Sequence, residues 1–294
     1  MLTYNLHHGE GTDAKLDLQR IADIIKSVAP YYAGLQEIDS VTLRTGKVNQ
    51  AAEYARLTNM EWDFGRAIPY EGGGYGNTLL CKVAPKKIAK ISLPGDEARM
   101  AIIADIDISN GQDPANSMVT FIDTHLMNGG PEAEADRLES AKLINAYVQD
   151  PAHGDITRPM ILLGDMNAVK GAASILEFQK QWQAADFDYG IDWVFFRPAN
   201  LWQFVRAAKL TTGTAAIASD HHPVEQNMVL LRPTVSISPL SHRQFKPGPI
   251  SYRTIIQFPQ LALGLFFSPE IRHQYIPGGT SLPDSSRKFQ IRAP

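Results

Sequence analysis

Short apolar runs that end in a polar side chain able to bind a metal ion or carry a proton recur along this chain. Folds of the α/β class usually place their chemistry at strand ends, so the pattern favours such a fold. Each motif alone is common, but their ordered combination is specific. In chain order they are Thr3-Tyr4-Asn5, Leu35-Gln36-Glu37, Thr124-His125-Leu126, Gly164-Asp165-Met166-Asn167-Ala168, Gly190-Ile191-Asp192 and Ser219-Asp220-His221-His222.

Hydrophobic periodicity supports the same fold class. Apolar spacing predicts helices over residues 16–28, 49–58 and 131–148, the first of them ending at Pro30. Alternating or continuous apolar runs predict strands over residues 2–6, 76–81, 100–108, 118–124, 160–163, 193–196 and 224–231, and a short strand leading to Gln36-Glu37. The segment from Gly72 to Asn77 lacks the features of a phosphate-binding loop, so it is predicted to be a turn.

Together the motifs resemble the endonuclease/exonuclease/phosphatase family. These metal-dependent phosphoesterases include deoxyribonuclease I, apurinic endonucleases, neutral sphingomyelinases and inositol-phosphate phosphatases. The resemblance covers roughly residues 1–231. It implies a four-layer α/β sandwich in which two packed mixed β-sheets are flanked by helices, whereas periodicity alone indicates only an α/β fold. We therefore expect a catalytic domain over residues 1–232.

Hydrolysis of a phosphodiester needs a polarised phosphoryl oxygen, an activated water and a stabilised leaving oxygen. Mg²⁺ or Mn²⁺ suits the first task and prefers oxygen ligands. The resemblance assigns the main metal ligand to Glu37, an amide ligand to Asn5 and a further contribution to Asp220. Taken singly, Glu37 is equally consistent with a solvated loop carboxylate and Asn5 with a turn residue.

Asp165 and Asn167 flank Met166, so in an extended chain their side chains point the same way. An acceptor and an amide aimed at one point suit water activation and a hydrogen bond to phosphate. The alternative is an Asx turn, which Gly164-Asp165 also favours.

Two histidines complete the predicted catalytic set. By resemblance, His221 contacts the scissile phosphate or transfers a proton, and Asp192 holds it in one tautomer. His222 is not expected to be catalytic, because that position varies in the family. His125 resembles the second family histidine, which binds phosphate or protonates the leaving oxygen.

Arg99 matches a family arginine that contacts this region, and its guanidinium suits an anionic oxygen pair; a surface ion pair is the alternative. Asn77 lines up with a family asparagine near the site. The chain also departs from the family. Gly74 stands where a glutamate often supports the histidine, with only Glu71 nearby, and the stretch from Asn167 to Asp192 is short. What supports His125 is left open.

Residues 233–294 lie outside the resemblance. They contain nine prolines and eight serines, and after Arg232 seven basic residues face two acidic ones, a net charge of +5. The preceding 232 residues carry 21 basic and 29 acidic residues, a net charge of −8. We expect a poorly ordered extension, or a wrapping segment anchored by the apolar residues 261–267, with a partner-binding or membrane-touching role as the alternative.

Cysteine content and apolar run length indicate the compartment in which the protein works. Cys81 is the only cysteine, so no intramolecular disulfide can form. No apolar run approaches the ~20 residues that span a bilayer. Met1 runs directly into the first predicted strand, which predicts a cytoplasmic protein unless a leader has been lost.

The sequence leaves four candidate functions. A phosphoesterase acting on a small or general phosphodiester is favoured. A nuclease acting on DNA or RNA comes second, because the acidic core offers no broad electrostatic footprint for nucleic acid. A sphingomyelinase-like hydrolase is third. A catalytically silent scaffold predicts loss of at least one residue of a set that is fully present, namely Glu37, Asp165, Asn167, Asp220 and His221.

Overall fold

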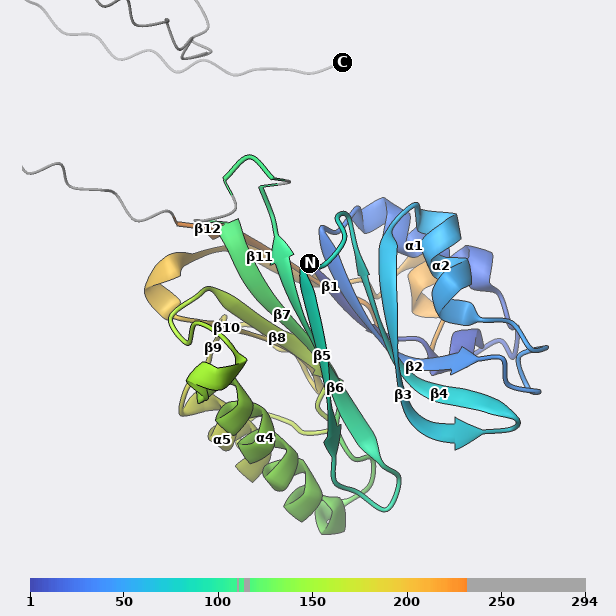
Figure 1. Cartoon of the computed structure of the whole chain (residues 1–294). Helices are drawn as coiled ribbons and strands as arrows, with labels where there is room; N and C mark the ends of the chain where they lie inside the picture. The colour runs from blue at the N-terminus through green and yellow to red at the C-terminus, as the bar shows by residue number, and fades with distance from the viewer. Residues whose placement is uncertain (110, 114–116, 232–294) are drawn as a thin grey trace, which may run out of the picture. The chain divides into compact units, whose positions relative to one another are not determined.

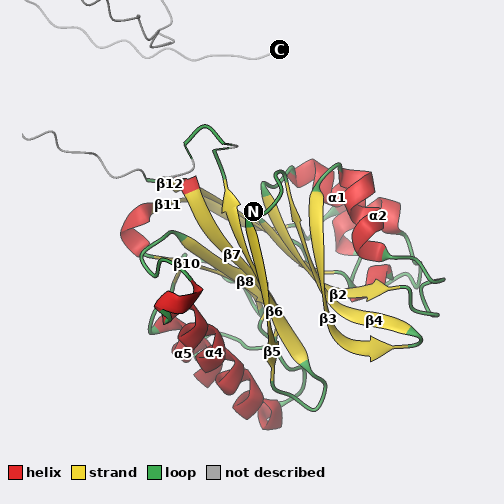
Figure 2. Cartoon of the chain, in the orientation of Figure 1, coloured by secondary structure: helices red, strands yellow, loops and turns green. Residues whose placement is uncertain are grey.

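The computed structural model describes residues 1–109, 111–113 and 117–231. These residues form two six-stranded mixed β-sheets that pack face to face, with helices on the outer faces (Figure 1, Figure 2). The predicted four-layer sandwich is therefore confirmed. The expected extension, residues 233–294, lies outside the described residues.

The first sheet has the strand order β11-β12-β1-β2-β4-β3. Its central strands β1 and β2 are parallel, and the remaining pairs are antiparallel. Helices α1 (Leu18–Val28) and α2 (Gln50–Thr58) cover its outer face (Figure 1). The strands are β1 (Leu2–Asn5), β2 (Tyr32–Ser40), β3 (Glu61–Tyr70), β4 (Gly73–Cys81), β11 (Trp202–Lys209) and β12 (Val224–Leu230).

The second sheet has the order β5-β6-β7-β8-β10-β9, again with one central parallel pair, β7 and β8. Helices α4 (Glu134–Gln149) and α5 (Ala173–Gln179) cover its outer face (Figure 2). The two halves thus share one plan. The strands are β5 (Lys87–Leu93), β6 (Arg99–Asp107), β7 (Met118–His125), β8 (Met160–Asp165), β9 (Gln183–Ala184) and β10 (Asp192–Arg197). Short 3₁₀ helices span His7–Gly9, Pro131–Ala133, Pro151–His153, Ala199–Leu201 and Gly213–Ala216.

The three predicted helices form close to where the sequence places them. Asp17 caps α1 by accepting a hydrogen bond from the Arg20 amide at 2.9 Å, and Asn49 caps α2 in the same way. Ala29, with a left-handed φ of 49°, ends α1 just before Pro30. Local capping and an apolar face are sufficient signals here.

The predicted turn at Gly72–Asn77 is wrong in extent, because β4 already begins at Gly73. Glycine in this segment instead allows β4 to lie close to its neighbouring strands. A Cβ atom at Gly76 would lie 1.9 Å from the carbonyl oxygen of Gly65 on β3. No clear sequence signal marked the short helix α5 or the strands β3, β5, β9 and β11, which lie at sheet edges. Edge strands bury less of each face and so show weaker alternation.

We predict that Gly164→Ala disrupts the fold. Gly164 has φ 146°, and a Cβ atom there would lie 1.8 Å from the Thr124 carbonyl oxygen on β7. Strain and overpacking together should lower the free energy of unfolding by roughly 3 kcal/mol or more. Gly171→Ala is the control, because Gly171 also has a positive φ, 93°, but the space around it is open. This variant should lose only about 1–2 kcal/mol in free energy of unfolding. If urea denaturation shows that both variants lose the same free energy of unfolding, the predicted clash at Gly164 is wrong.

Candidate active site

The predicted site residues gather at one edge of the two sheets. Hydrogen bonds and ion pairs connect seven of them, contributed by the ends of β1, β7 and β8, a bulge inside β2, the start of β10 and the loops after β8 and before β12. These seven are Asn5, Glu37, His125, Asp165, Asn167, Asp192 and His221. Because both sheets contribute, the site exists only when the sheets pack together.

Glu37 occupies a β-bulge that re-aims its side chain. The pairing register of β2 with β4 shifts between Leu35 and Ile38, and Glu37 has a left-handed φ of 59°. β2 therefore continues beyond Glu37, further than the sequence indicated. The bulge places the half-buried Glu37 carboxylate 2.9 Å from the side-chain nitrogen of Asn5.

Asn5 presents its nitrogen to the carboxylates. Its Nδ2 donates both to Glu37 Oε1 and, at 3.0 Å, to Asp165 Oδ2. Its Oδ1 accepts from the His7 amide at 3.1 Å. This differs from the expected role, in which the amide oxygen would be a ligand, because the nitrogen faces the carboxylates and the oxygen faces the His7 amide.

Asp165 and Asn167 meet at His125, although not by the expected geometry. β8 ends at Asp165, and Asn167 has a left-handed φ of 47°, so the extended-chain argument was wrong. The Asn167 amide donates to Asp165 Oδ1 at 2.8 Å, as in the alternative Asx turn. Its side chain nevertheless donates to His125 Nε2 at 3.1 Å, and Asp165 Oδ2 lies 3.6 Å from the same atom.

His125 is held by asparagines. In the amide orientation that satisfies its neighbours, Asn77 Oδ1 accepts from the His125 amide at 3.1 Å. Burial lowers the pKa of the His125 imidazole well below its ordinary value, and the positive charges of Arg99 and His221 lower it further. His125 is therefore a neutral ring at physiological pH.

Neither Gly74 nor Glu71 supports His125. A Cβ atom at Gly74 would meet the Arg66 side chain at 2.5 Å, so Arg66 fills that space. Glu71 accepts a hydrogen bond from the Arg44 amide at 2.7 Å instead. The support that the sequence left open thus comes from Asn77 and Asn167.

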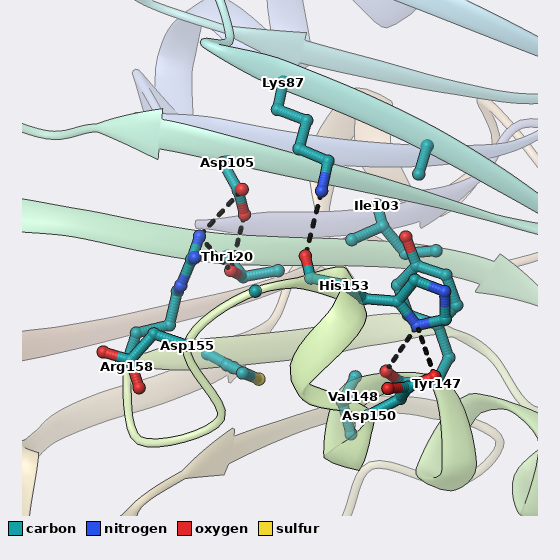
Figure 3. A pocket seen from close by; sticks show the side chains of 13 residues that line it. Lys87, Ile103, Asp105, Thr120, Tyr147, Val148, Asp150, His153, Asp155 and Arg158 are labelled. Atoms are coloured by element: carbon teal, nitrogen blue, oxygen red, sulfur yellow. Dashed lines mark hydrogen bonds and ion pairs between the residues drawn. The ribbon is translucent and has the colours of Figure 1, made fainter.

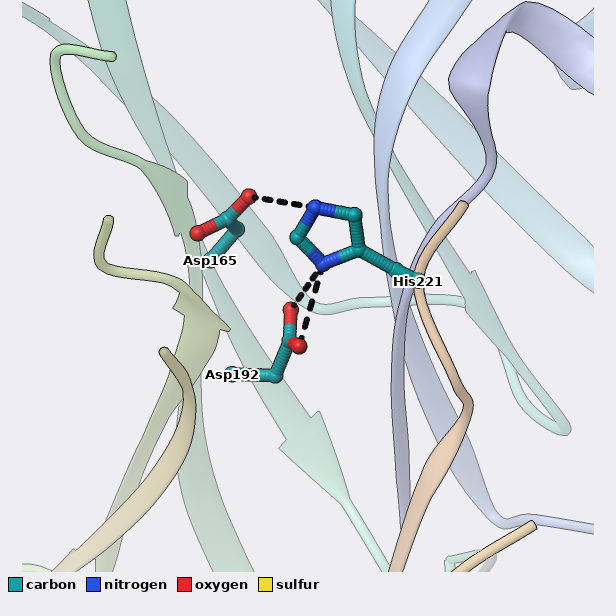
Figure 4. A group of neighbouring side chains, drawn as sticks. All are labelled: Asp165, Asp192 and His221. Atoms are coloured by element: carbon teal, nitrogen blue, oxygen red, sulfur yellow. Dashed lines mark hydrogen bonds and ion pairs between the residues drawn. The ribbon is translucent and has the colours of Figure 1, made fainter. Parts of the chain in front are cut away.

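His221, Asp192 and Asp165 form a tight cluster (Figure 4). Both Asp192 oxygens lie 3.0 Å from His221 Nδ1, and Asp165 Oδ2 lies 3.6 Å from Nε2. Burial alone would lower the pKa of His221. The hydrogen bond and charge of Asp192, with the charges of Asp165 and Asp220, outweigh it and raise that pKa to about 9. His221 is therefore an imidazolium at neutral pH.

Asp165 is almost fully buried beside another carboxylate. Burial raises the pKa of Asp165, and the charge of Asp192 raises it further, to about 7, against the opposing effects of His221, Asn5 and Asn167. A carboxylate that titrates near neutral pH suits a general base.

Asp220 and Arg99 lie differently from the other predicted residues. Asp220 is exposed and contacts Ser219 Oγ at 3.2 Å. Arg99 is 5% exposed and pairs with Glu97, and its Nε has no hydrogen-bond partner among the described residues. A simple surface ion pair therefore does not describe Arg99.

Sequence reasoning missed Ser219. Its hydroxyl lies 2.8 Å from the Asn5 carbonyl oxygen and accepts from the His221 amide at 3.3 Å, so it fastens the His221 segment to β1. The available signal was its position directly before the Asp-His pair.

The carboxylates at this edge fit a hard divalent cation. One atom each from Asp165, Asp192 and His221 lies within 4.8 Å of the others. The His221 imidazolium has no free lone pair, so the carboxylate oxygens are the available ligands. Glu37 joins this cluster through its hydrogen bond with Asn5. Two buried carboxylates that share one imidazolium leave negative charge that a bound cation would compensate. The cluster differs from the predicted ligand set of Glu37, Asn5 and Asp220.

A separate pocket lies at the other end of the second sheet (Figure 3). Its polar side chains pair with one another: Arg158 Nη1 lies 2.7 Å from Asp105 Oδ2, and Thr120 donates to the other Asp105 oxygen. Met160, at the start of β8, lines this pocket, whereas Asp165 ends the same strand in the site. Five strand residues span about 16 Å, so this pocket is separate from the site.

Comparison with known proteins agrees with the fold. The family model described as "Endonuclease/Exonuclease/phosphatase family" matches residues 2–221. The chain belongs to this family and is a hydrolase of phosphate-ester bonds. No curated protein matches it in sequence. Among the described residues, no helix is both long and apolar enough to cross a bilayer.

Solved structures share the fold at low identity. An endonuclease/exonuclease/phosphatase from Beutenbergia cavernae DSM 12333 aligns with TM-score 0.61 and 20% identity over 78% of this chain and 71% of its own. The mannosyl-6-phosphatase Bt3783 of Bacteroides thetaiotaomicron VPI-5482 aligns with TM-score 0.58 and 18% identity over 78% and 98%. The human Nocturnin catalytic domain with bound sulfate gives 0.61 and 15% over 78% and 92%.

We predict that Asp192→Asn removes the charge from His221 at neutral pH. Without the Asp192 carboxylate, burial dominates and the pKa of His221 should fall from about 9 to its ordinary value of ~6.5 or below. NMR titration of the His221 ring in metal-free protein measures this, with the other histidine resonances as an internal reference. An unchanged His221 titration would contradict the assigned pairing.

Proposed function

We propose that the protein is a divalent-metal-dependent phosphoesterase that hydrolyses its substrate by in-line attack of an activated water. The observation that carries the proposal is the meeting of Glu37, Asp165 and the His221–Asp192 pair at one edge of both sheets. This arrangement provides an anionic site for a cation, a carboxylate base and a fixed imidazolium.

Glu37 would hold Mg²⁺ or Mn²⁺ beside Asn5, and Asp220 would contribute from the exposed rim. The ion would supply charge that polarises the phosphoryl oxygen. Asp165, which titrates near neutral pH, accepts the proton of the attacking water. Asn167 fixes Asp165 through its backbone amide.

The two histidines take different roles in this proposal. His221, charged and held by Asp192, donates a hydrogen bond to the phosphate or a proton to the leaving oxygen. His125 is neutral, so it orients the phosphate by hydrogen bonding. Arg99 is buried beside it, its Nε has no hydrogen-bond partner in the described part of the chain, and it provides positive charge for the same group.

A small phosphodiester is the proposed substrate. The net charge of −8 over residues 1–232 disfavours extended contact with a nucleic-acid backbone. The similar structures include one called a mannosyl-6-phosphatase, so phosphomonoesters belong in the same screen, together with plasmid DNA and sphingomyelin.

Turnover of bis-(p-nitrophenyl) phosphate should require a divalent cation. We expect chelation to abolish it, and Mg²⁺ or Mn²⁺ to restore it better than Zn²⁺, because the proposed ligands are mainly oxygen donors. Undiminished turnover in excess chelator would exclude the metal mechanism.

Three substitutions test the assigned residues in the same assay. Glu37→Ala, Asp165→Ala and His221→Ala should each lose on the order of 10²-fold or more in turnover, since each removes charge stabilisation or proton transfer. Asp155→Ala, at an exposed carboxylate outside the site, should retain activity. Near-wild-type rates for any two of the three would place the site elsewhere.

We also propose that residues 1–232 contain the whole hydrolytic machinery. In support, β12 pairs with both β1 and β11 and ends at Leu230, which completes the first sheet. A chain ending at Arg232 should therefore stay soluble and keep its turnover of the small diester. Aggregation would assign residues 261–267 to the core, and soluble but inactive protein would assign part of the site to the extension.

A further inference from the structure

A buried polar contact joins the two sheets directly behind the site. The Gln36 side chain, on β2, donates from Nε2 to Asp123 Oδ1, on β7, at 2.6 Å. Both side chains are completely buried, and the residues around them belong to the apolar core between the sheets. A polar pair in such a place is costly unless its hydrogen bonds are made.

The surrounding residues are shaped to accommodate this contact. A Cβ atom at Gly34 would lie 2.4 Å from Asp123 Oδ1, so only glycine leaves room for the carboxyl group. Gln36 Nε2 also donates to Thr3 Oγ1, on β1, at 3.2 Å. Three central strands from both sheets therefore meet at the Gln36 side chain.

Gln36 is also fixed through its backbone, beside the strained residue. Its carbonyl oxygen accepts from the Leu6 amide at 3.0 Å, next to Asn5. Glu37 follows with its left-handed φ of 59° inside the bulge. Such a conformation is unfavourable for a residue with a side chain and persists only where its neighbours determine it.

We propose that the Gln36–Asp123 hydrogen bond positions the metal site, because it locks the β2 bulge in the geometry that turns Glu37 toward Asn5 and Asp165. The inference rests on the proposed function in one respect, that Glu37 is a metal ligand. Gln36 and Asp123 are positioning residues and act through Glu37. Partners that orient metal ligands typically contribute 10–100-fold in metal affinity.

The test is calorimetric titration of the full chain with MnCl₂, using variants that separate the hydrogen bond from the packing. Gln36→Met keeps the length of the side chain but removes its donor, and Asp123→Leu removes the acceptor. Both should weaken Mn²⁺ binding by about 10-fold or more. Asp123→Asn keeps an Oδ1 acceptor for Gln36 and should bind Mn²⁺ like the wild type.

Two controls keep the outcomes distinct. Val119→Ala, in the core on the same strand as Asp123, should lower the free energy of unfolding without changing the Mn²⁺ dissociation constant. Glu37→Gln should lose Mn²⁺ binding and so tests the proposed function itself. Circular dichroism confirms that each titrated variant is folded, and if Gln36→Met does not fold, the comparison of Asp123→Leu with Asp123→Asn decides.

The proposal is overturned, with the metal mechanism intact, if Gln36→Met and Asp123→Leu bind Mn²⁺ like the wild type while Glu37→Gln does not. It is also overturned if Val119→Ala weakens Mn²⁺ binding as much as Gln36→Met and Asp123→Leu do. The same conclusion follows if Asp123→Asn weakens Mn²⁺ binding as much as Asp123→Leu does. Absence of Mn²⁺ binding by the wild type would overturn both the proposal and the function on which it rests.

Discussion

The side-chain nitrogen of Asn5 lies 2.9 Å from a Glu37 oxygen and 3.0 Å from an Asp165 oxygen, so one amide group joins carboxylates from two sheets. The rest of the site depends on that contact. Asp165 reaches it only because β8 ends beside β1, and Glu37 only because β2 is bulged. Burial and the charge of Asp192 raise the pKa of Asp165 there, and the charges of Asp192, Asp165 and Asp220 outweigh burial and keep His221 an imidazolium.

The shared plan of the two sheets explains why the chemistry gathers at one edge. Each sheet has a central parallel pair, and polar residues follow or end these strands. Packing the sheets face to face brings the two sets of strand ends together. The hydrogen bond between Gln36 and Asp123 lies just behind this edge, so the same packing that builds the core also fixes the ligand geometry.

One departure from the family pattern bears on the electrostatics of the site. With Gly74 in place of a glutamate, His125 has asparagine partners and a nearby arginine, and its ring stays neutral. His221 keeps its carboxylate partner and its charge. The two histidines are therefore unequal, and the cationic one is the histidine that Asp192 holds.

Local signals in the sequence determined the helices α1, α2 and α4, the interior strands, the order of the polar motifs and, through that order, the family. Capping residues and apolar periodicity act over a few residues and can be read without a structure. The edge strands β3, β5 and β11, the conformation of Asn167, the bulge at Glu37 and the orientation of the Asn5 amide could not be read in this way. Each depends on a partner far away in the chain: Asn5 meets Asp165 at a separation of 160 residues, and Gln36 meets Asp123 at 87. Only tertiary packing decides which of two geometrically allowed conformations such a residue adopts, because the hydrogen bonds that select it do not exist until the two sheets are in contact.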